Sequence, residues 1–130
     1  MTRAWTCTMN YRRGDIALVY FPHSDLYTIK LRPVLIVQVD NLNTGIRQVV
    51  VAMISSNLSR SGHPSRVTIL LADPLAVGAG LQLDSVIMID NLATIELTQF
   101  KSKLGNFSAM GLVDKALVRT LGINLKTSGN

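Results

Sequence analysis

At 130 residues, with 48% hydrophobic and 16% charged residues, the chain is long enough for one domain with a buried core and too apolar for a disordered protein. The single cysteine excludes an internal disulfide framework and is typical of a reducing cytoplasm, and the apolar runs are far shorter than a membrane-spanning helix. The net charge of +5 favours a polyanionic partner such as nucleic acid, although the basic residues are dispersed along the chain. We therefore expect a cytoplasmic protein that is not attached to a membrane.

Five apolar stretches bounded by turn residues predict β-strands, at 16–21, 34–39, 47–55, 66–71 and 85–89. The first follows a turn at 12–15 and stops at Pro22, and the second and third predict an antiparallel pair because turn residues join them. A loop over 56–65 precedes the fourth strand, and the glycines at 78–80 predict a flexible connection before the fifth. A further stretch, 94–103, alternates only in part and predicts a short strand or turn.

The last element is an amphipathic helix. Its apolar residues recur at helical spacing, at Met110, Val113, Leu117 and Leu121. Ser108 is a suitable N-cap, and Gly122 stands where a C-cap glycine belongs. The order of elements predicts a mainly β (α+β) fold, a small barrel of five or six strands with a C-terminal helix. We expect one domain over 11–123, with a loose N-terminal tail at 1–10 and a C-terminal tail at 124–130.

The sequence lacks the patterns of the common catalytic and cofactor sites. Cysteine, histidine and carboxylates do not cluster at metal-ligand spacing, no serine has the G-x-S-x-G context of a hydrolase, and the glycines at 78 and 80 do not open a phosphate-binding helix. We therefore expect no metal and no cofactor. The two histidines, His23 and His63, lie in different loops, where they either form an acid–base pair for a phosphodiester or remain solvated bystanders.

Arg32 combines a permanent charge with a restrained backbone, because the proline that follows it limits the conformations of the residue before it. A guanidinium stays protonated near neutral pH, so it cannot serve as an ordinary base, but it can bind a phosphate through two parallel hydrogen bonds. It can also stabilise the charge that grows on a phosphate in a transition state. The alternative interpretation is an exposed arginine, or an ion pair with Asp15 or Asp25.

Several short motifs follow one another between residues 12 and 123. They are Gly14-Asp15 before a strand, Phe21-Pro22, Lys30 to Pro33, Met53 to Ser56, Gly80 to Val86, Asp90 to Ile95, and a closing turn and helix from Gly105 to Ile123. Each motif is loose on its own. In this order and at this spacing they resemble the MazF/PemK toxins of type II toxin–antitoxin systems.

The resemblance implies a toxin with an SH3-like barrel that works as a homodimer, is bound by a cognate antitoxin and inhibits growth by cleaving single-stranded RNA at short sequence motifs, without a metal ion. Matched position by position, Arg32 is similar to the family's catalytic arginine, and Ser55 falls on its catalytic Thr/Ser hydroxyl. RNA supplies its own nucleophile, the 2′-hydroxyl, so the protein needs only to orient the strand and stabilise the transition state. Candidate substrate-binding residues in or beside the neighbouring loops are His23, Lys30, Ser56 and Arg60, and His23 is also a candidate base.

One departure from the family is Ala93, in a segment where many relatives carry an arginine. If that arginine holds RNA, this protein cleaves weakly or at different sites. Two other classes stay open. A non-catalytic nucleic-acid-binding barrel would need the basic surface but not Ser55, and a CcdB-like toxin would share the fold and inhibit a topoisomerase through protein contacts without Arg32.

Overall fold

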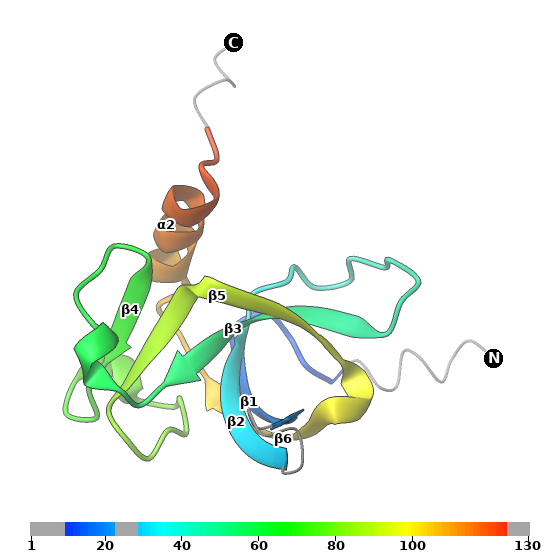
Figure 1. Ribbon diagram of the computed structural model, residues 1–130, viewed down its shortest axis with the longest axis horizontal. Coiled ribbons are helices and arrows are strands. Elements are labelled where there is room, and N and C mark those ends of the chain that lie inside the picture. The colour runs from blue at the N-terminus through cyan, green and yellow to red at the C-terminus, as the bar shows by residue number, and fades with distance from the viewer. Residues whose placement is uncertain (1–9, 23–28, 125–130) are drawn as a thin grey trace.

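The computed structural model describes residues 10–22 and 29–124, which form a strongly bent antiparallel sheet with a helix against it (Figure 1). The strands of this part of the chain are β1 (Asp15–Pro22), β2 (Ile29–Ile36), β3 (Gln48–Ser55), β4 (Arg66–Ile69), β5 (Ser85–Glu96) and β6 (Phe100–Asn106), and the helix is α2 (Met110–Leu121). Short 3₁₀ turns lie between them, at η1 (Leu58–Arg60), η2 (Pro74–Ala76) and η3 (Leu97–Gln99). The strands pair in the order β4-β5-β3-β2-β1-β6. The mainly β fold with a C-terminal helix is therefore confirmed.

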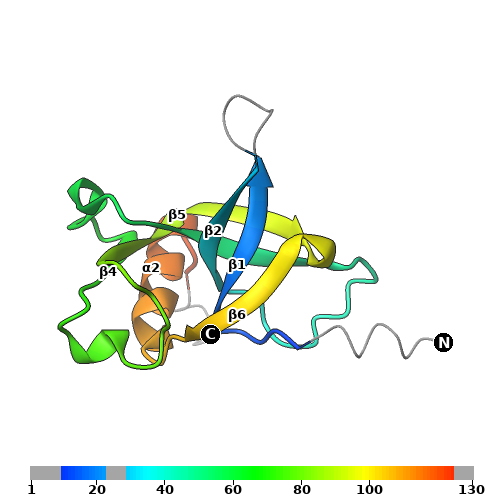
Figure 2. The ribbon, with the colours of Figure 1, turned by 90° about the horizontal axis from the view of Figure 1, so that it is seen from below.

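The sheet bends where its long strand, β5, changes register. β5 pairs with β4 near its start and with β3 along most of its length, and the β3–β5 register shifts between Ala52 and Met53. The β1–β6 pairing also shifts, between Ile16 and Ala17 and again two residues later. Such bulges bend a strand and increase its twist, so the sheet curls on itself (Figures 1 and 2).

Two apolar clusters pack on the two faces of this curled sheet. One cluster lies beside α2 and includes Leu35, Ile54 and Val113, whereas the other includes Val34 and Val51. Because successive residues of a strand point to opposite faces, β2 and β3 contribute to both clusters. This explains why these strands appear in the sequence as unbroken apolar runs rather than as alternating ones.

The helix α2 packs on β4 and β5 through the buried side chains of Val113 and Ala116. Gly122 ends it with a left-handed φ of 67°, and its N–H donates to the carbonyl of Val118. The predicted C-cap is therefore confirmed.

The predicted N-cap of the helix is wrong. The residue that precedes the helix is Ala109, which makes no side-chain cap hydrogen bond. Phe107 is buried, and its N–H donates to the Gly14 carbonyl at 2.8 Å. The chain is thus still held against the sheet beside Ser108, so the helix begins later than the sequence pattern indicated.

The turn before β1 is confirmed and is tied to β6 by Asp15. The backbone N–H of Asp15 donates to the Arg12 carbonyl at 3.0 Å, and its carboxylate accepts the Arg12 N–H at 2.8 Å. The same carboxylate accepts the Asn106 side-chain amide at 3.3 Å and pairs with the Lys103 ammonium at 3.3 Å. Asp15 therefore has its own partners and does not neutralise Arg32.

Two strand boundaries differ from the sequence prediction in ways that matter for function. β2 begins at Ile29 rather than at residue 34, so Arg32 lies inside the strand, opposite Val19 of β1, rather than at its mouth. β5 continues to Glu96 rather than ending at residues 90–91, because the exposed Asp90 can remain in the strand while its carboxylate pairs with an arginine of β4. The stretch 94–103 accordingly holds the end of β5, η3 and the start of β6. The described residues contain no helix that is long and apolar enough to span a membrane.

Candidate active site

A groove of about 500 Å³ opens where β2 and β3 separate. It is lined by Leu18, Lys30, Leu31, Arg32, Pro33, Ile54, Ser55, Ser56, Asn57, Gly80, Leu81, Gln82, Leu83, Ser85 and Leu104. The β2–β3 pairing runs only from Val34 to Ile36 on β2. Proline has no N–H to donate, so Pro33 is a suitable residue at the point where the pairing stops and the groove begins.

Arg32 and Ser55 line this groove from two neighbouring strands. Val34 pairs with Met53, and Arg32 and Ser55 lie two residues beyond this last pair on their own strands. Side chains alternate along a strand and paired residues share a face, so Arg32 and Ser55 lie on the same face of the sheet. The structure therefore brings together the two residues that the sequence placed in the catalytic role.

The guanidinium of Arg32 is exposed, and it makes no hydrogen bond or ion pair with any residue that the structure describes. The walls of the groove include no Asp or Glu among the described residues, whereas Lys30 adds a second positive charge. Asp25, the other predicted ion-pair candidate, lies outside the described residues. Among the described residues, no carboxylate competes with an anion for these two charges.

The hydroxyl of Ser55 is half-buried and held in place. Its oxygen accepts the N–H of Asn57 at 3.0 Å. The side-chain oxygen of Asn57 in turn accepts the N–H and the hydroxyl of Ser59, at 3.1 and 2.7 Å, and caps η1. Because one lone pair of the Ser55 oxygen is occupied, its O–H hydrogen can be donated to a ligand in the groove.

Residues 80–83 form the wall opposite the two strands, and the connection at 78–80, which was predicted to be flexible, is instead packed and hydrogen-bonded. Ala79 is fully buried, and the Gly78 carbonyl accepts the Asn106 N–H at 2.8 Å. Gly80 has a φ of +78°, and a Cβ at this position would collide with the carbonyl of Leu104. A glycine is therefore required where this wall meets β6. The two glycines in the sequence indicate that the backbone is unusual here. The segment that Gly80 approaches could not be predicted from the sequence, because it depends on the tertiary structure.

The remaining candidate residues divide between the groove and its surroundings. Lys30 and Ser56 line it, but Arg60 lies on η1 outside it. His23 lies outside the described residues, so its pairing with a second histidine stays a prediction. His63 lies in the loop before β4, where Nδ1 accepts the Ser65 N–H at 3.0 Å and lies 2.8 Å from its hydroxyl oxygen.

The groove combines the chemical features that a nucleotide needs. Two cations and a hydroxyl can bind a phosphate, and leucine side chains at positions 18, 31, 81, 83 and 104 offer apolar surface to a base. No group of three or more His, Cys, Asp or Glu residues that could hold a metal ion occurs in the described part of the chain.

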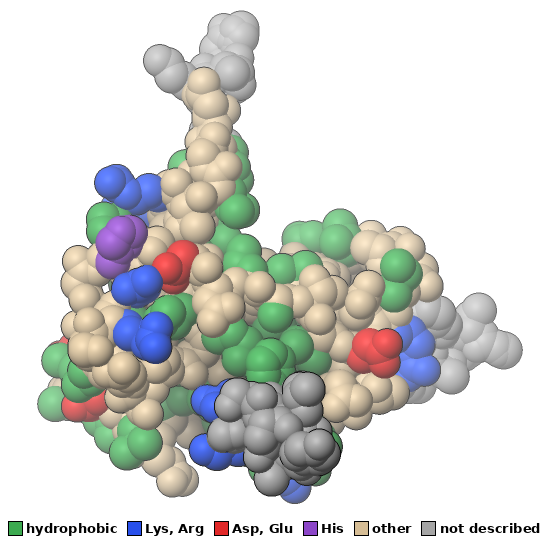
Figure 3. Space-filling view, in the orientation of Figure 1, with side chains coloured by type: hydrophobic (Ala, Val, Ile, Leu, Met, Phe, Trp, Pro, Cys, Tyr) green, Lys and Arg blue, Asp and Glu red, His purple; other side chains and the backbone are tan. Residues whose placement is uncertain are grey.

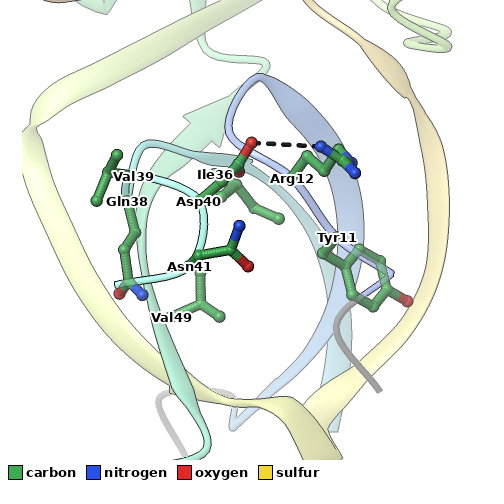
Figure 4. Close-up of a pocket in the computed structure, with 8 residues that line it drawn as sticks. All are labelled: Tyr11, Arg12, Ile36, Gln38, Val39, Asp40, Asn41 and Val49. Carbon is green, nitrogen blue, oxygen red and sulfur yellow. Dashed lines mark ion pairs between the residues drawn. The ribbon is translucent and has the colours of Figure 1, made fainter. Parts of the chain in front are cut away.

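A second cavity, of about 50 Å³, lies between the N-terminal turn and the segment after β2 (Figure 4). Tyr11, Gln38 and Asn41 are among its lining residues, and the one ion pair drawn there joins Arg12 Nη1 to Asp40 Oδ2 at 3.6 Å. It includes none of the predicted site residues. The larger groove is therefore the candidate active site.

Comparison with protein families matches residues 12–121 to the PemK-like, MazF-like toxins of type II toxin–antitoxin systems. The chain belongs to this family. Endoribonuclease MazF of Staphylococcus epidermidis is 31% identical to this MazF/PemK-like toxin over 121 residues, which cover 87% of this chain and 92% of that protein. A mycobacterial endoribonuclease solved in complex with its cognate antitoxin superposes with a TM-score of 0.68 at 22% identity, over 88% of this chain and 97% of that one. The Mycobacterium tuberculosis toxin MazF-mt6 gives a TM-score of 0.66 at 24% identity, over 85% and 98%.

Ala93, where many relatives of this MazF/PemK-like toxin were expected to carry an arginine, lies away from the groove lining. It sits in β5 opposite Val51, and its side chain packs against the apolar cluster that contains Val34. The missing charge therefore does not interrupt the described walls of the groove.

Proposed function

We propose that this toxin is an endoribonuclease that cleaves single-stranded RNA in the Arg32–Ser55 groove, with a preference for short sequence motifs and without a metal ion or cofactor. The observation that carries the proposal is that Arg32 and Ser55 line one groove whose described walls include no Asp or Glu. A groove that collects positive charge and keeps carboxylates away attracts a phosphodiester.

The RNA itself supplies the nucleophile. Its 2′-hydroxyl oxygen forms a bond to the adjacent phosphorus, the bond from phosphorus to the 5′-oxygen breaks, and a 2′,3′-cyclic phosphate and a 5′-hydroxyl result. The proton leaves the 2′-hydroxyl for a base, and the departing 5′-oxygen takes up a proton from water. Arg32 faces the non-bridging oxygens, where negative charge grows, and stabilises that charge. His23 remains the candidate base from the sequence.

Ser55 has a complementary role in this proposal. Its oxygen already accepts the Asn57 N–H, so the hydroxyl hydrogen is directed toward a phosphate oxygen. This hydrogen bond fixes the phosphate beside Arg32 while the apolar part of the groove holds a neighbouring base. We expect the segments 23–31 and 56–65 to determine the cleavage sequence.

The partners follow from the family. Because a mycobacterial relative was solved with its cognate antitoxin, we propose that a cognate antitoxin binds this chain and blocks cleavage. We also propose a homodimer as the active form. Light scattering of the toxin alone and mixed with the antitoxin tests both statements.

The decisive experiment measures RNA cleavage in excess chelator by the parent, Arg32→Ala and the matched control Lys101→Ala. Lys101 is an exposed basic residue on β6 that does not line the groove. We expect cleavage by the parent and the control, and a loss of at least ~100-fold in Arg32→Ala, the scale of removing one transition-state donor. An RNA with a 2′-deoxy nucleotide at the cut site should resist cleavage. If the parent binds RNA but does not cleave it, the protein is a non-catalytic nucleic-acid-binding barrel. If it neither binds nor cleaves RNA and inhibits a topoisomerase, it belongs to the CcdB-like class.

A further inference from the structure

A second groove, of about 480 Å³, lies between α2 and β4, the strand at one edge of the sheet. Arg66 and Thr68 of β4 line one side, and Leu112, Lys115 and Arg119 of α2 line the other. Among the described residues that form its walls there is no Asp or Glu. Figure 3 shows basic side chains over this part of the molecule, with an acidic side chain and a histidine among them, and another basic group on the same face.

Lys115 and Arg119 are the free charges of this groove. They are exposed, four residues apart on one face of α2, and neither makes an ion pair with any residue that the structure describes. Like charges at this spacing repel each other and destabilise a helix. The acidic neighbour Asp114 does not relieve the repulsion, since its carboxylate pairs with Arg13 Nη2 at 2.7 Å.

Arg66 has a different role in the same groove. Its Nε and Nη2 donate to the two carboxylate oxygens of Asp90 at 3.2 and 2.7 Å, and its Nη1 donates to the Arg60 carbonyl at 3.1 Å. These side-chain hydrogen bonds raise the pKa of Arg66 and lower that of Asp90. The charge of Arg66 is thus compensated by Asp90, and its hydrogen bond to the Arg60 carbonyl ties η1 to β4.

The two grooves lie at the two ends of one loop. Ser56 and Asn57, at the start of this loop, line the Arg32 groove, and Pro64, near its end, lines the α2–β4 groove. Across the sheet, Ser55 pairs with Val86 and Val86 with Thr68, which is two strand spacings or about 10 Å. Thr68 lines the same groove as Lys115 and Arg119, so this groove lies two strands away from Ser55.

We propose that the α2–β4 groove is a second RNA-binding site, in which Lys115 and Arg119 bind backbone phosphates outside the nucleotides that are cleaved. The proposal rests on the proposed function for the identity of the polyanion. RNA is favoured over an acidic peptide because the two basic grooves lie at the two ends of one loop, and Arg60 adds a third positive charge within that loop. The site therefore contributes affinity for long substrates rather than choice of sequence.

The test compares the parent, the double variant Lys115→Ala/Arg119→Ala, and the charge-matched control Arg12→Ala/Lys101→Ala. The probes are labelled 2′-O-methyl RNAs of about 4 and about 16 nucleotides, the range of lengths bound by single-strand-binding domains, which cannot be cleaved. Fluorescence anisotropy gives the affinity at several salt concentrations. We expect the double variant to bind the long RNA roughly tenfold more weakly, with a salt slope about 1.4 lower, equivalent to two lost phosphate contacts. Binding of the short RNA and of both RNAs to the control variant should follow the parent.

Several results would overturn the proposal. If the double variant loses equal affinity for short and long RNA, Lys115 and Arg119 act only through the overall electrostatic potential of the protein. If the salt dependence of its affinity for long RNA is unchanged, the two residues do not contact the RNA. If the double variant differs from the parent in its mass by light scattering, the groove is a contact between subunits. If the double variant binds RNA normally but is inhibited less by the antitoxin, the groove binds an acidic peptide of the antitoxin. Cleavage of unmodified RNA is measured separately, so an inactive parent that still shows the length-dependent binding would contradict the nuclease and not this site.

Discussion

Two outward-facing arginines of the sheet differ in whether a carboxylate lies within reach. Arg66, at the start of β4, donates to both carboxylate oxygens of Asp90 and to a backbone carbonyl. Arg32, in β2, makes no hydrogen bond or ion pair with any described residue and lines a groove without an acidic wall. The comparison shows how one side chain serves two purposes. An arginine fixes a loop where the fold brings a carboxylate to it, and it can bind a ligand where, as among the described residues around Arg32, no carboxylate lies within reach.

The largest expected effect separates the two arginines directly. Arg32→Ala should lower RNA cleavage by at least ~100-fold because it removes a transition-state donor, with little change in melting temperature because the side chain is exposed and without a described partner. Arg66→Ala should show the reverse, a lower melting temperature and a much smaller loss of cleavage on a short RNA. Initial rates and thermal unfolding of the same preparations measure both. Similar losses of activity in the two variants would contradict the distinction.

The sequence predicted Arg32 better than its surroundings. Proline at position 33 indicated a restrained arginine, and the apolar runs indicated strands on either side. Ser55 was identified only through the family resemblance, because its place in the same groove as Arg32 depends on how β2 pairs with β3. The role of Arg66 was not visible, since Asp90 follows 24 residues later on another strand.

The errors have the same origin in tertiary structure. The connection at 78–80 was predicted to be flexible because glycine allows many backbone conformations. In the structure, Gly80 instead allows the backbone to lie close to β6. Ser108 has the right residue type for an N-cap, but the buried Phe107 next to it holds the chain against the sheet. Residue type and spacing determine which conformations are possible, whereas contacts between distant segments select among them.

The next prediction tests whether the wall that faces Arg32 is fixed. Gly80→Ala should lower the free energy of unfolding by about 2–4 kcal/mol, since alanine disfavours the φ of +78° and its Cβ would collide with the Leu104 carbonyl. Gly111→Ala is the matched control. It lies in α2 with nothing near the added Cβ, and alanine should stabilise the helix there by about 0.5–1 kcal/mol. Urea unfolding measures both, and a neutral Gly80→Ala would mean that the wall rearranges easily.

A further variant would give Arg32 the kind of partner that Arg66 has. Gln82 is exposed and lines the Arg32 groove, so Gln82→Glu places a carboxylate in it. The new charge should repel the phosphate and compete for Arg32, weakening RNA binding and cleavage by roughly tenfold, an effect of about 1.4 kcal/mol. Gln82→Ala controls for loss of the amide. If the two variants cleave equally well, the absence of an acidic wall is not what makes Arg32 available.

The smallest effect concerns the pH dependence of the Arg66–Asp90 pair. The hydrogen bond from Arg66 lowers the pKa of Asp90 below its ordinary value of 3.8. Above that value the carboxylate is ionised in both the folded and the unfolded chain, and the pair contributes fully to stability. As the pH falls, Asp90 is protonated first in the unfolded chain, which lowers the stability of the folded state. Once the pH has fallen through the lower pKa of the folded state, the contribution of the pair is lost. The free energy of unfolding of the parent should therefore approach that of Asp90→Asn between about pH 5 and pH 2.

The change should be modest and weaken in salt, because both side chains are partly exposed. A difference between parent and variant that stays constant over this range would show that Arg66 does not stabilise the ionised form of Asp90, and the contrast with Arg32 would lose its physical basis.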